Sequence, residues 1–383
     1  MQVSAESAAS PRVLEHIAGL DPYEPGLSIV EIREKYGLDQ IIKLASNENP
    51  LGTSNLVIDA IRAGASGVFR YPRGGNPALV RAIAEWHKVP AENVVVGDGS
   101  DEIIDMLIRM TAKKGDNIVC FNPCFALYPS QARVADIEIK RARLKDDFSF
   151  DLEELLRLTD ENTRLAFLTT PDNPTGYCPP EDDVRRFVRE LGAKAPRALL
   201  VIDEAYMDFA PDEKASSLLA SGELPANAAF LRTFSKSFGL AGLRIGYGIV
   251  PENIARAFWA ARLPFSVNIL AEEAVLAALR DEAFREKTLS VVREGREILS
   301  AGLARAGCEV FPSSANFIMF RPPVAKPREF FEELLKRGVI IRRLKSYGLP
   351  DYFRVSVGSP RENELFLKAV GEILNGSNTG EPA

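Results

Sequence analysis

Short apolar runs that alternate with helical segments constrain the fold of this chain more than any other feature of its sequence. The runs are NVVVG (93–97), NIVCF (117–121), RLAFLTT (164–170), RALLVID (197–203), AAFLRTF (228–234) and GLRIGYGIV (242–250). A strand with one exposed face shows alternating polar and apolar residues, so runs without that alternation indicate strands buried on both faces. Helices are expected between the runs, for example from Asn76 onward and over 102–112. The pattern predicts an α/β fold in which helices cover both faces of a doubly wound, mostly parallel sheet.

The pattern changes near residues 263–268, and the length of 383 residues favours two domains. A long amphipathic stretch over 270–306 is followed by short strand-like runs and by helices expected at 327–337 and 361–374. These segments predict a smaller α+β domain. We expect an N-terminal arm with part of the small domain over 1–45 and a large domain over 46–268. The small domain then covers 269–376, and a polar, disordered tail covers 377–383.

Composition excludes several classes of function. The net charge of −6 and the lack of a long basic run argue against a nucleic-acid-binding protein. No apolar stretch approaches the roughly 20 residues that span a bilayer. The N-terminus lacks the basic and apolar regions of a secretory signal, so a cytoplasmic protein without a membrane partner is expected. Four scattered cysteines and the two histidines, His16 and His87, match no metal site.

Four polar loops follow or join the predicted strands, where α/β sheets bind ligands. GDGSDEII (97–104) can bind phosphate at a helix start, although Ser100 or Asp101 as a helix N-cap is the simpler interpretation. TPDNPTG (170–176) is typical of a turn. VIDEAYMDF (201–209) ends an apolar strand in Asp203, which is either a solvated carboxylate or a partner for a cation. RTFSKSFGLAGLRIGY (232–247) combines hydroxyls, a lysine and an arginine, which suit either an exposed basic loop or a phosphate site beside a nucleophilic amine.

The order of these loops resembles that of the fold-type I pyridoxal-phosphate aminotransferases, and more narrowly that of the histidinol-phosphate aminotransferase family. The resemblance covers nearly the whole chain. Further matching stretches are DPYEPG (21–26), LASNENPLG (44–52), FRYPRGG (69–75), NPCFALY (122–128), RLPFSVN (262–268), ANFIMF (315–320) and KSYGLPDYFRVSVG (345–358). It implies a large domain with a mostly parallel seven-stranded sheet, a smaller α+β domain, and pyridoxal 5′-phosphate as the cofactor.

The resemblance also implies roles for individual residues. Lys236 corresponds to the lysine that bonds covalently to the cofactor, and Asp203 to the carboxylate that faces the pyridine nitrogen. The phosphate contacts correspond to Ser100, the backbone of Asp101, Ser235 and Arg244, and the partners of the ring hydroxyl to Asn173 and Tyr206. Tyr71 corresponds to a tyrosine that reaches the phosphate from a neighbouring subunit, so a homodimer with shared sites is expected. The substrate contacts correspond to Arg354 and, further, to Arg342, Tyr23 and Asn47.

Two positions leave questions open within this resemblance. The aromatic residue that stacks on the cofactor ring is often tyrosine, and here it is Phe125, which retains the π face but lacks the hydroxyl. Ser237 is a weaker match than Ser235, because the residue after the lysine varies in the family. For Arg342, a solvated strand end is an equally simple interpretation.

The implied reaction is amino transfer from L-histidinol phosphate to 2-oxoglutarate, which gives imidazole acetol phosphate and glutamate in histidine biosynthesis. In this reaction the freed Lys236 moves a proton as base and then as acid. An aromatic amino-acid transaminase, acting on phenylalanine or tyrosine, is the main alternative. A threonine-phosphate decarboxylase, a carbon–sulfur lyase and a non-enzymatic sensor domain share the fold and are weaker alternatives.

Overall fold

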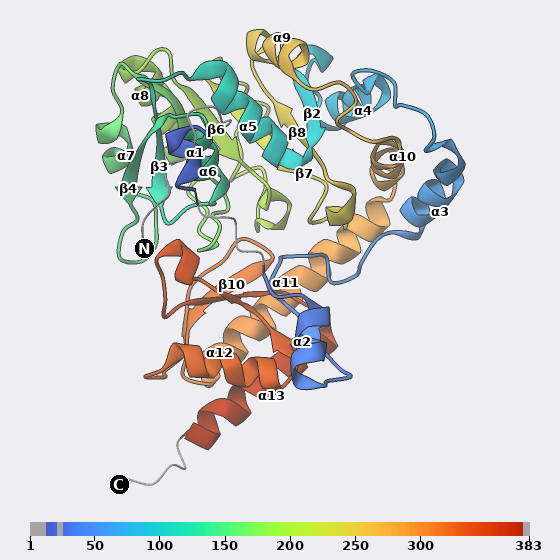
Figure 1. Cartoon of the computed structure of the whole chain (residues 1–383), viewed down its shortest axis with the longest axis vertical. Coiled ribbons are helices and arrows are strands. Elements are labelled where there is room, and N and C mark those ends of the chain that lie inside the picture. The colour runs from blue at the N-terminus through green and yellow to red at the C-terminus, as the bar shows by residue number, and fades with distance from the viewer. Residues whose placement is uncertain (1–12, 21–25, 378–383) are drawn as a thin grey trace, which may run out of the picture.

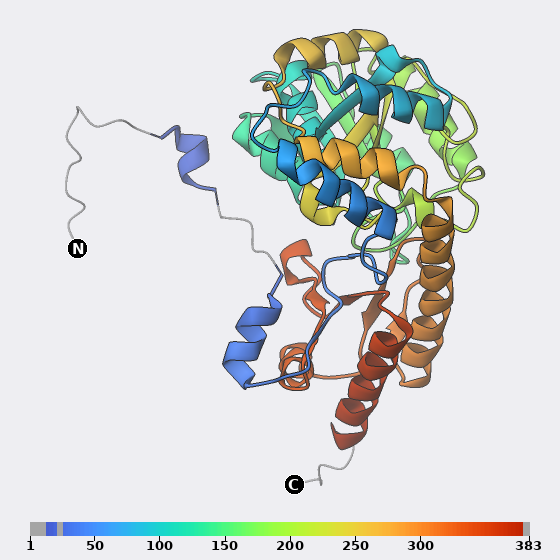
Figure 2. The ribbon, with the colours of Figure 1, turned by 90° about the vertical axis from the view of Figure 1, so that its right-hand side faces the viewer.

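The computed structural model describes residues 13–20 and 26–377, which form two parts with a separate sheet in each (Figure 1). The larger part contains a seven-stranded sheet, and the smaller part contains a four-stranded sheet. The long helix α11 (Glu282–Arg305) runs from the larger part along the smaller one, as the side view shows (Figure 2). The two parts are therefore joined by continuous secondary structure as well as by loops.

The large sheet has the strand order β2-β8-β7-β6-β5-β3-β4. All neighbouring pairs from β7 to β4 are parallel, whereas β8 is antiparallel to both β2 and β7. The strands are β2 (Val94–Asp98), β3 (Asn117–Asn122), β4 (Glu138–Arg143), β5 (Thr163–Thr169), β6 (Leu199–Asp203), β7 (Ala228–Thr233) and β8 (Ile245–Ile249). The expected α/β fold with a mostly parallel seven-stranded sheet is confirmed.

Helices bury both faces of this sheet. In β6, Leu200 and Ile202 belong to one apolar core, and Leu199 and Val201 belong to the other. The first core is closed by α3 (Asn55–Gly64), α4 (Pro77–His87), α7 (Leu152–Leu158), α8 (Glu181–Lys194) and α10 (Ile269–Ala278), and the second by α5 (Gly99–Thr111), α6 (Leu127–Val134) and α9 (Glu252–Ala261). Both faces of each central strand are thus apolar, which explains why the sequence of these strands does not alternate.

The smaller part is built around an antiparallel sheet with the order β12-β13-β10-β9. Its elements are β9 (Glu309–Val310), β10 (Phe317–Arg321), β12 (Arg342–Arg343), β13 (Phe353–Ser356), α11, α12 (Pro327–Lys336) and α13 (Pro360–Ser377). Phe317, Phe320, Phe353 and Phe366 are fully buried in its core. This part has the α+β architecture that the sequence predicts.

The described residues 26–45 pack mainly on the smaller part. β1 (Ile42–Lys43) pairs in parallel with β11 (Val339–Ile340), and α2 (Ile29–Tyr36) buries Ile32 against Leu335 and Ile340. α1 (Glu15–Ala18) instead contacts α6 of the larger part. The chain then crosses between the two parts over the LASNENPLG stretch.

The amphipathic stretch expected over 270–306 forms two helices. α10 ends at Ala278, and Asp281 caps α11 by accepting a hydrogen bond from the N–H of Phe284 at 3.1 Å. α10 buries Ala274 and Val275 in a core of the large sheet, so α10 belongs to the larger part and the smaller part begins after it. The boundary proposed at 268 and 269 is therefore about one helix too early. Residue 377, expected in the tail, still belongs to α13, and 378–383 lie outside the described residues.

Among residues 13–20 and 26–377, no helix has the length and apolar character needed to cross a membrane.

A close approach between β8 and the start of α5 generates a prediction about stability. A Cβ on Gly246 would lie 2.3 Å from the backbone nitrogen of Ser100. We expect Gly246→Ala to lower the free energy of unfolding by about 1–3 kcal/mol, because backbone must move to admit the methyl group. Urea unfolding followed by circular dichroism measures this change.

The matched control is Gly371→Ala in α13, where an added Cβ meets nothing within 4 Å. Alanine at a helical position is about 0.5–1 kcal/mol more stable than glycine, so this variant should unfold at a slightly higher urea concentration. Equal unfolding midpoints for the two variants would show that β8 and α5 are not closely packed.

Candidate active site

The predicted site residues of the larger part meet at one edge of the large sheet. The parallel register pairs Thr169 at the end of β5 with Asp203 at the end of β6, and pairs Asp203 with Leu231 of β7. The loops that follow these three strands therefore begin side by side. This edge is where the carboxyl ends of parallel strands bring ligand-binding residues together.

Lys236 lies in the loop after β7, and its amine is directed into the site. The Nζ atom donates a hydrogen bond to the carbonyl oxygen of Ser46 at 3.3 Å and lies 5.6 Å from the ring centroid of Tyr206. Burial, and then the positive charge of Arg354, lower the pKa of Lys236 to about 8. A lysine with a pKa this low has an appreciable neutral fraction near neutral pH, which is the nucleophilic form.

Asp203 ends β6 and is 3% exposed. Its carboxylate accepts hydrogen bonds from the hydroxyl of Tyr128 at 2.7 Å and from the N–H of Ala205 at 3.1 Å. Burial raises the pKa of Asp203 to about 6. Both hydrogen-bond donors are neutral, so a cationic ring nitrogen would supply the charge that stabilises the ionised carboxylate.

Sequence reasoning missed Tyr128, which supports Asp203 from α6. Its hydroxyl also lies 2.8 Å from Oγ1 of Thr169, and its ring stacks on Phe167 with centroids 4.4 Å apart. Tyr128 is the last residue of the matching stretch NPCFALY, but its buried position depends on how α6 packs. The sequence motif therefore contains Tyr128 but does not indicate that this tyrosine contacts Asp203.

The start of α5, with Arg244 and Ser235, forms a corner suited to an anion. The helix begins at Gly99 and its N-cap is Asp98, whose side chain forms no capping hydrogen bond, so the alternative of Ser100 or Asp101 as the N-cap is wrong. Uncapped N–H groups at a helix start favour anion binding. Arg244 holds a left-handed φ of 53° and donates from Nη2 to Oδ2 of Asp101 at 3.0 Å.

Ser235 and Ser237 lie in different surroundings although they flank Lys236. The Ser235 hydroxyl accepts from Oγ1 of Thr233 at 2.9 Å. The Ser237 hydroxyl donates to Asp208 and is fully buried, away from the Arg244 corner. The sequence leaves the role of Ser237 open, and the structure directs its hydroxyl to Asp208.

Arg354 brings the smaller part into the site from β13. Nη1 donates to the side-chain oxygen of Asn173, and Nη2 donates to the carbonyl oxygen of Ala45 at 3.0 Å. Nε is buried and has no hydrogen-bond partner among the described residues. Arg342 is the direct cross-strand neighbour of Arg354, so the two side chains share one face of the sheet. This face is rich in donors for an anionic group.

Asn47 joins Tyr206 to the smaller part. Its side-chain nitrogen donates to the Tyr206 hydroxyl at 3.1 Å, and its side-chain oxygen accepts from the hydroxyl of Ser356 at 2.8 Å. The carbonyl oxygen of Asn47 accepts from the side chain of Asn316 at 3.1 Å. Asn47 is 1% exposed, so its immediate role is to orient Tyr206.

The remaining predicted residues divide into three cases. Phe125 is half-buried and packs its ring edge-to-face with that of Tyr128 at 5.6 Å, close to Asp203. Tyr71 is 80% exposed and stacks on Phe265 at 4.8 Å, so it does not contribute to the site of its own chain. Tyr23 lies outside the described residues.

The chemical groups of these residues match those of pyridoxal phosphate. The uncapped start of α5 and Arg244 suit a phosphate, the Lys236 amine suits an aldehyde, and the Asp203 carboxylate suits a protonated ring nitrogen. Asn173 and Tyr206 are both buried polar residues beside these groups. The arrangement defines a site for a phosphorylated aldehyde with a basic ring.

Comparison with known proteins agrees with this class. Residues 39–370 match the family described as aminotransferase class I and II. Because the match covers most of the chain, the protein belongs to this family of aminotransferases.

Two relatives and one solved structure are similar along almost their whole length. The histidinol-phosphate aminotransferase of Nitratidesulfovibrio vulgaris strain Hildenborough is 55% identical over 374 residues, covering 97% of this chain and 99% of the relative. That of Oleidesulfovibrio alaskensis is 52% identical over 364 residues, covering 94% of each. The crystal structure of the histidinol-phosphate aminotransferase from Sinorhizobium meliloti in complex with pyridoxal-5′-phosphate superposes with a TM-score of 0.87 at 25% identity, covering 97% of this chain and 99% of that one.

The lowered pKa of Lys236 predicts a pH dependence of its reactivity. In the cofactor-free protein, acetylation of Lys236 by trace acetic anhydride should rise with pH around a midpoint near 8, because only the neutral amine reacts. An unperturbed lysine titrates near 10.4. Mass spectrometry of the Lys236 peptide measures the midpoint.

Arg354→Met is the companion variant. It removes the positive charge that lowers the pKa of Lys236 and leaves most of the burial in place, so the midpoint should move upward. A wild-type midpoint near 10.4 would mean that the amine is hydrated and does not lie in the site.

Proposed function

We propose that this protein is a histidinol-phosphate aminotransferase that uses pyridoxal 5′-phosphate. It transfers the amino group of L-histidinol phosphate to 2-oxoglutarate and releases imidazole acetol phosphate and glutamate. The observation that carries the proposal is the 55% identity with the Nitratidesulfovibrio vulgaris enzyme over nearly the full length of both chains. The site geometry supports it, because every described residue expected from one chain lies at or beside the carboxyl edge of the large sheet or on the facing sheet.

When bound, pyridoxal phosphate supplies an electron sink for the carbanion that forms at the substrate carbon. Lys236 would hold the cofactor covalently, and its amine, once free, would act as base toward the substrate carbon and then as acid at the other end of the electron sink. Its pKa of about 8 suits both directions of this transfer. Asp203 holds a proton on the ring nitrogen through its buried carboxylate. Arg244, Ser235 and the start of α5 bind the phosphate.

Further residues bind the ring of the cofactor. Asn173 and Tyr206 serve the ring hydroxyl, and Phe125 stacks on the ring without the hydrogen bond that a tyrosine hydroxyl would add. Asn47, expected as a substrate contact, also orients Tyr206, to which it donates a hydrogen bond.

Arg354 and Arg342 bind the anionic group of each substrate in turn. A forked guanidinium forms paired hydrogen bonds with a carboxylate or with a phosphate, so one site accepts glutamate and histidinol phosphate. The buried Nε of Arg354 supplies a further donor for this purpose. Tyr23 is proposed as an additional contact on the strength of the sequence resemblance.

The proposal predicts a substrate preference. With 2-oxoglutarate as acceptor, kcat/KM for L-histidinol phosphate should exceed that for phenylalanine and tyrosine by roughly a hundredfold. Each charge-assisted hydrogen bond to the phosphate contributes about 1.5–3 kcal/mol, and a single bond in the upper part of that range already gives this factor. A coupled assay for glutamate, with each substrate varied, measures the three values.

A preference for phenylalanine or tyrosine would favour an aromatic amino-acid transaminase. Product formation without 2-oxoglutarate would indicate a decarboxylase or a lyase, and no turnover of any substrate would indicate a sensor domain.

We also infer that the active unit is a homodimer with shared sites. Tyr71, Phe69 and Leu263 are 80%, 76% and 71% exposed, which is unusual for large side chains gathered near one another. The stacking of Tyr71 on Phe265 holds its hydroxyl outside the site of its own chain. A second copy related by twofold symmetry would cover these side chains and place each Tyr71 at the other site.

Complementation between two inactive variants tests the shared sites. Lys236→Ala and Tyr71→Ala, unfolded and refolded together in equal amounts, should recover about a quarter of wild-type activity, because half of the dimers are mixed and each has one intact site. Variants refolded separately provide the baseline. Activity of the mixture equal to the average of the separate samples would refute the contribution of Tyr71 to a neighbouring site.

A further inference from the structure

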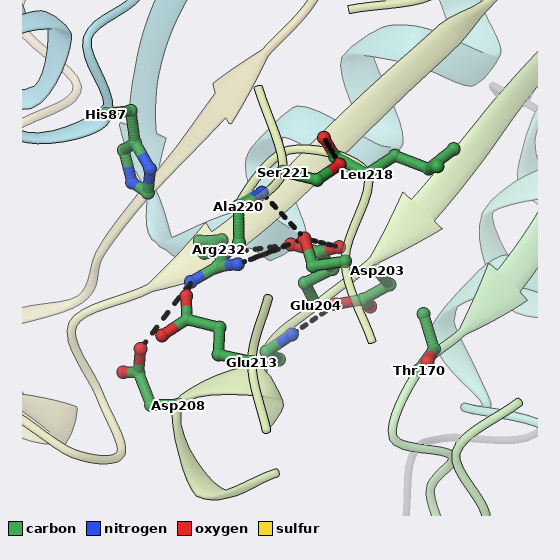
Figure 3. A network of polar contacts seen from close by, with 12 residues as sticks. His87, Thr170, Asp203, Glu204, Asp208, Glu213, Leu218, Ala220, Ser221 and Arg232 are labelled. Carbon is green, nitrogen blue, oxygen red and sulfur yellow. Dashed lines mark hydrogen bonds and ion pairs between the residues drawn. The ribbon is translucent and has the colours of Figure 1, made fainter. Parts of the chain in front are cut away.

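A largely buried cluster of charged side chains lies next to Asp203 (Figure 3). It consists of three carboxylates, Glu204, Asp208 and Glu213, and two guanidinium groups, Arg232 and Arg285; we call it the Arg232 cluster. Arg232 is 4% exposed and donates from Nε and Nη2 to Oε2 of Glu204 at 2.9 and 2.7 Å. Its Nη1 donates to Glu213 at 2.6 Å and lies 3.5 Å from Oδ1 of Asp208.

The Arg232 cluster is joined directly to both central site residues. Glu204 follows Asp203 in the chain, at the end of β6. Ser237 follows Lys236, and its hydroxyl donates to Oδ2 of Asp208. The other oxygen of Asp208 accepts from Nη2 of Arg285 at 3.0 Å and faces Arg232, so Asp208 is held from two sides. A continuous path of peptide bonds, hydrogen bonds and ion pairs thus connects Lys236 with Asp203.

Stability alone is a weak reason for such a cluster. Removing guanidinium and carboxylate groups from water costs several kcal/mol per ion, and apolar residues of similar size often stabilise as well or better. Orientation is a stronger reason, because a misplacement of about 1 Å between reacting groups lowers rates about a hundredfold. Lys236 lies on a loop, which by itself would hold its amine less rigidly than a strand or helix would.

We propose that Arg232 and Asp208 are positioning residues of this enzyme. They hold Lys236 and Asp203 at a fixed separation, acting through Ser237 and Glu204. Neither touches the cofactor or the substrate. The inference rests on the roles of Lys236 and Asp203 in the proposed function.

The main test is Ser237→Ala, which cuts the link from Lys236 to Asp208 and leaves every ion pair in place. We expect kcat for the amino transfer to fall about tenfold while KM for both substrates stays within about twofold, because the reacting groups are misplaced and the substrate contacts are not. The visible circular dichroism of the bound cofactor should change as well, since it reports how the cofactor is oriented in the holoenzyme.

The matched control is Thr163→Ala. Thr163 is fully buried at the first residue of β5, at the opposite edge of the large sheet from Lys236, and its hydroxyl donates to the side-chain oxygen of Asn117 at 2.8 Å. This variant should lower Tm because a buried acceptor loses its donor. It should leave kcat, KM and the circular dichroism of the cofactor at their wild-type values.

A second pair of variants keeps the inference testable should Ser237→Ala fail to fold. Arg232→Lys retains the charge but cannot fork between Glu204 and Glu213, so kcat should fall with little change in KM. Its control is Arg164→Lys, which weakens a similarly buried ion pair with Asp116, 2.8 Å long, at a site away from the loops. Arg164→Lys should affect Tm only.

The outcomes separate this inference from the proposed function. Normal kcat and normal circular dichroism in Ser237→Ala and Arg232→Lys, with Tm lowered as in the controls, would show that the Arg232 cluster is only structural. Wild-type protein that fails to transaminate histidinol phosphate would instead refute the proposed function, whatever the variants do.

Discussion

The parallel pairing of β5, β6 and β7 is the constraint on which the rest of the structure depends. Strands paired in parallel end at the same edge of a sheet, so Asn173, Asp203 and Lys236 meet, although α8 separates the first two in the chain and a long connection separates the last two. The antiparallel strand β8 begins at this same edge, which brings in Arg244 just before it. β2 is antiparallel to β8 and ends there, which adds the start of α5. Mixed strand direction thus gathers one site from five strands.

Burial in this apolar surrounding changes the two central side chains in opposite directions. It raises the pKa of Asp203 to about 6 and lowers the pKa of Lys236 to about 8, because in each case the charged form loses its hydration. The raised pKa of Asp203 favours its pairing with a cation, and the lowered pKa of Lys236 supplies a neutral amine near neutral pH. Packing against the large sheet removes both side chains from water. The positive charge of Arg354, from the small sheet, lowers the pKa of Lys236 further.

The site also depends on how the two parts of the chain meet. Arg354 and Ser356 belong to β13, yet their partners are Asn173 in the large part and the crossing segment at Ala45 and Asn47. The register of β12 on β13 sets Arg342 beside Arg354. Substrate recognition and cofactor chemistry are thereby tied to one interface, and α11, which carries Arg285 to Asp208, crosses it as well.

Sequence patterns predicted the α/β class and the smaller α+β part, both of which the structure confirms, and the resemblance named most residues of the candidate site. Apolar runs and strand-end loops are local features that predict strands and the positions of binding loops. The order of the motifs around Asn173, Asp203 and Lys236 added the resemblance that assigned roles to these residues. Other features of the site and of the cores could be seen only in the tertiary structure. It placed Tyr128 on Asp203, turned Ser237 toward Asp208, left α5 without a side-chain cap, and assigned α10 to the large core. Each of these depends on contacts between residues distant in the chain, and hydrophobic periodicity carries no information about such contacts.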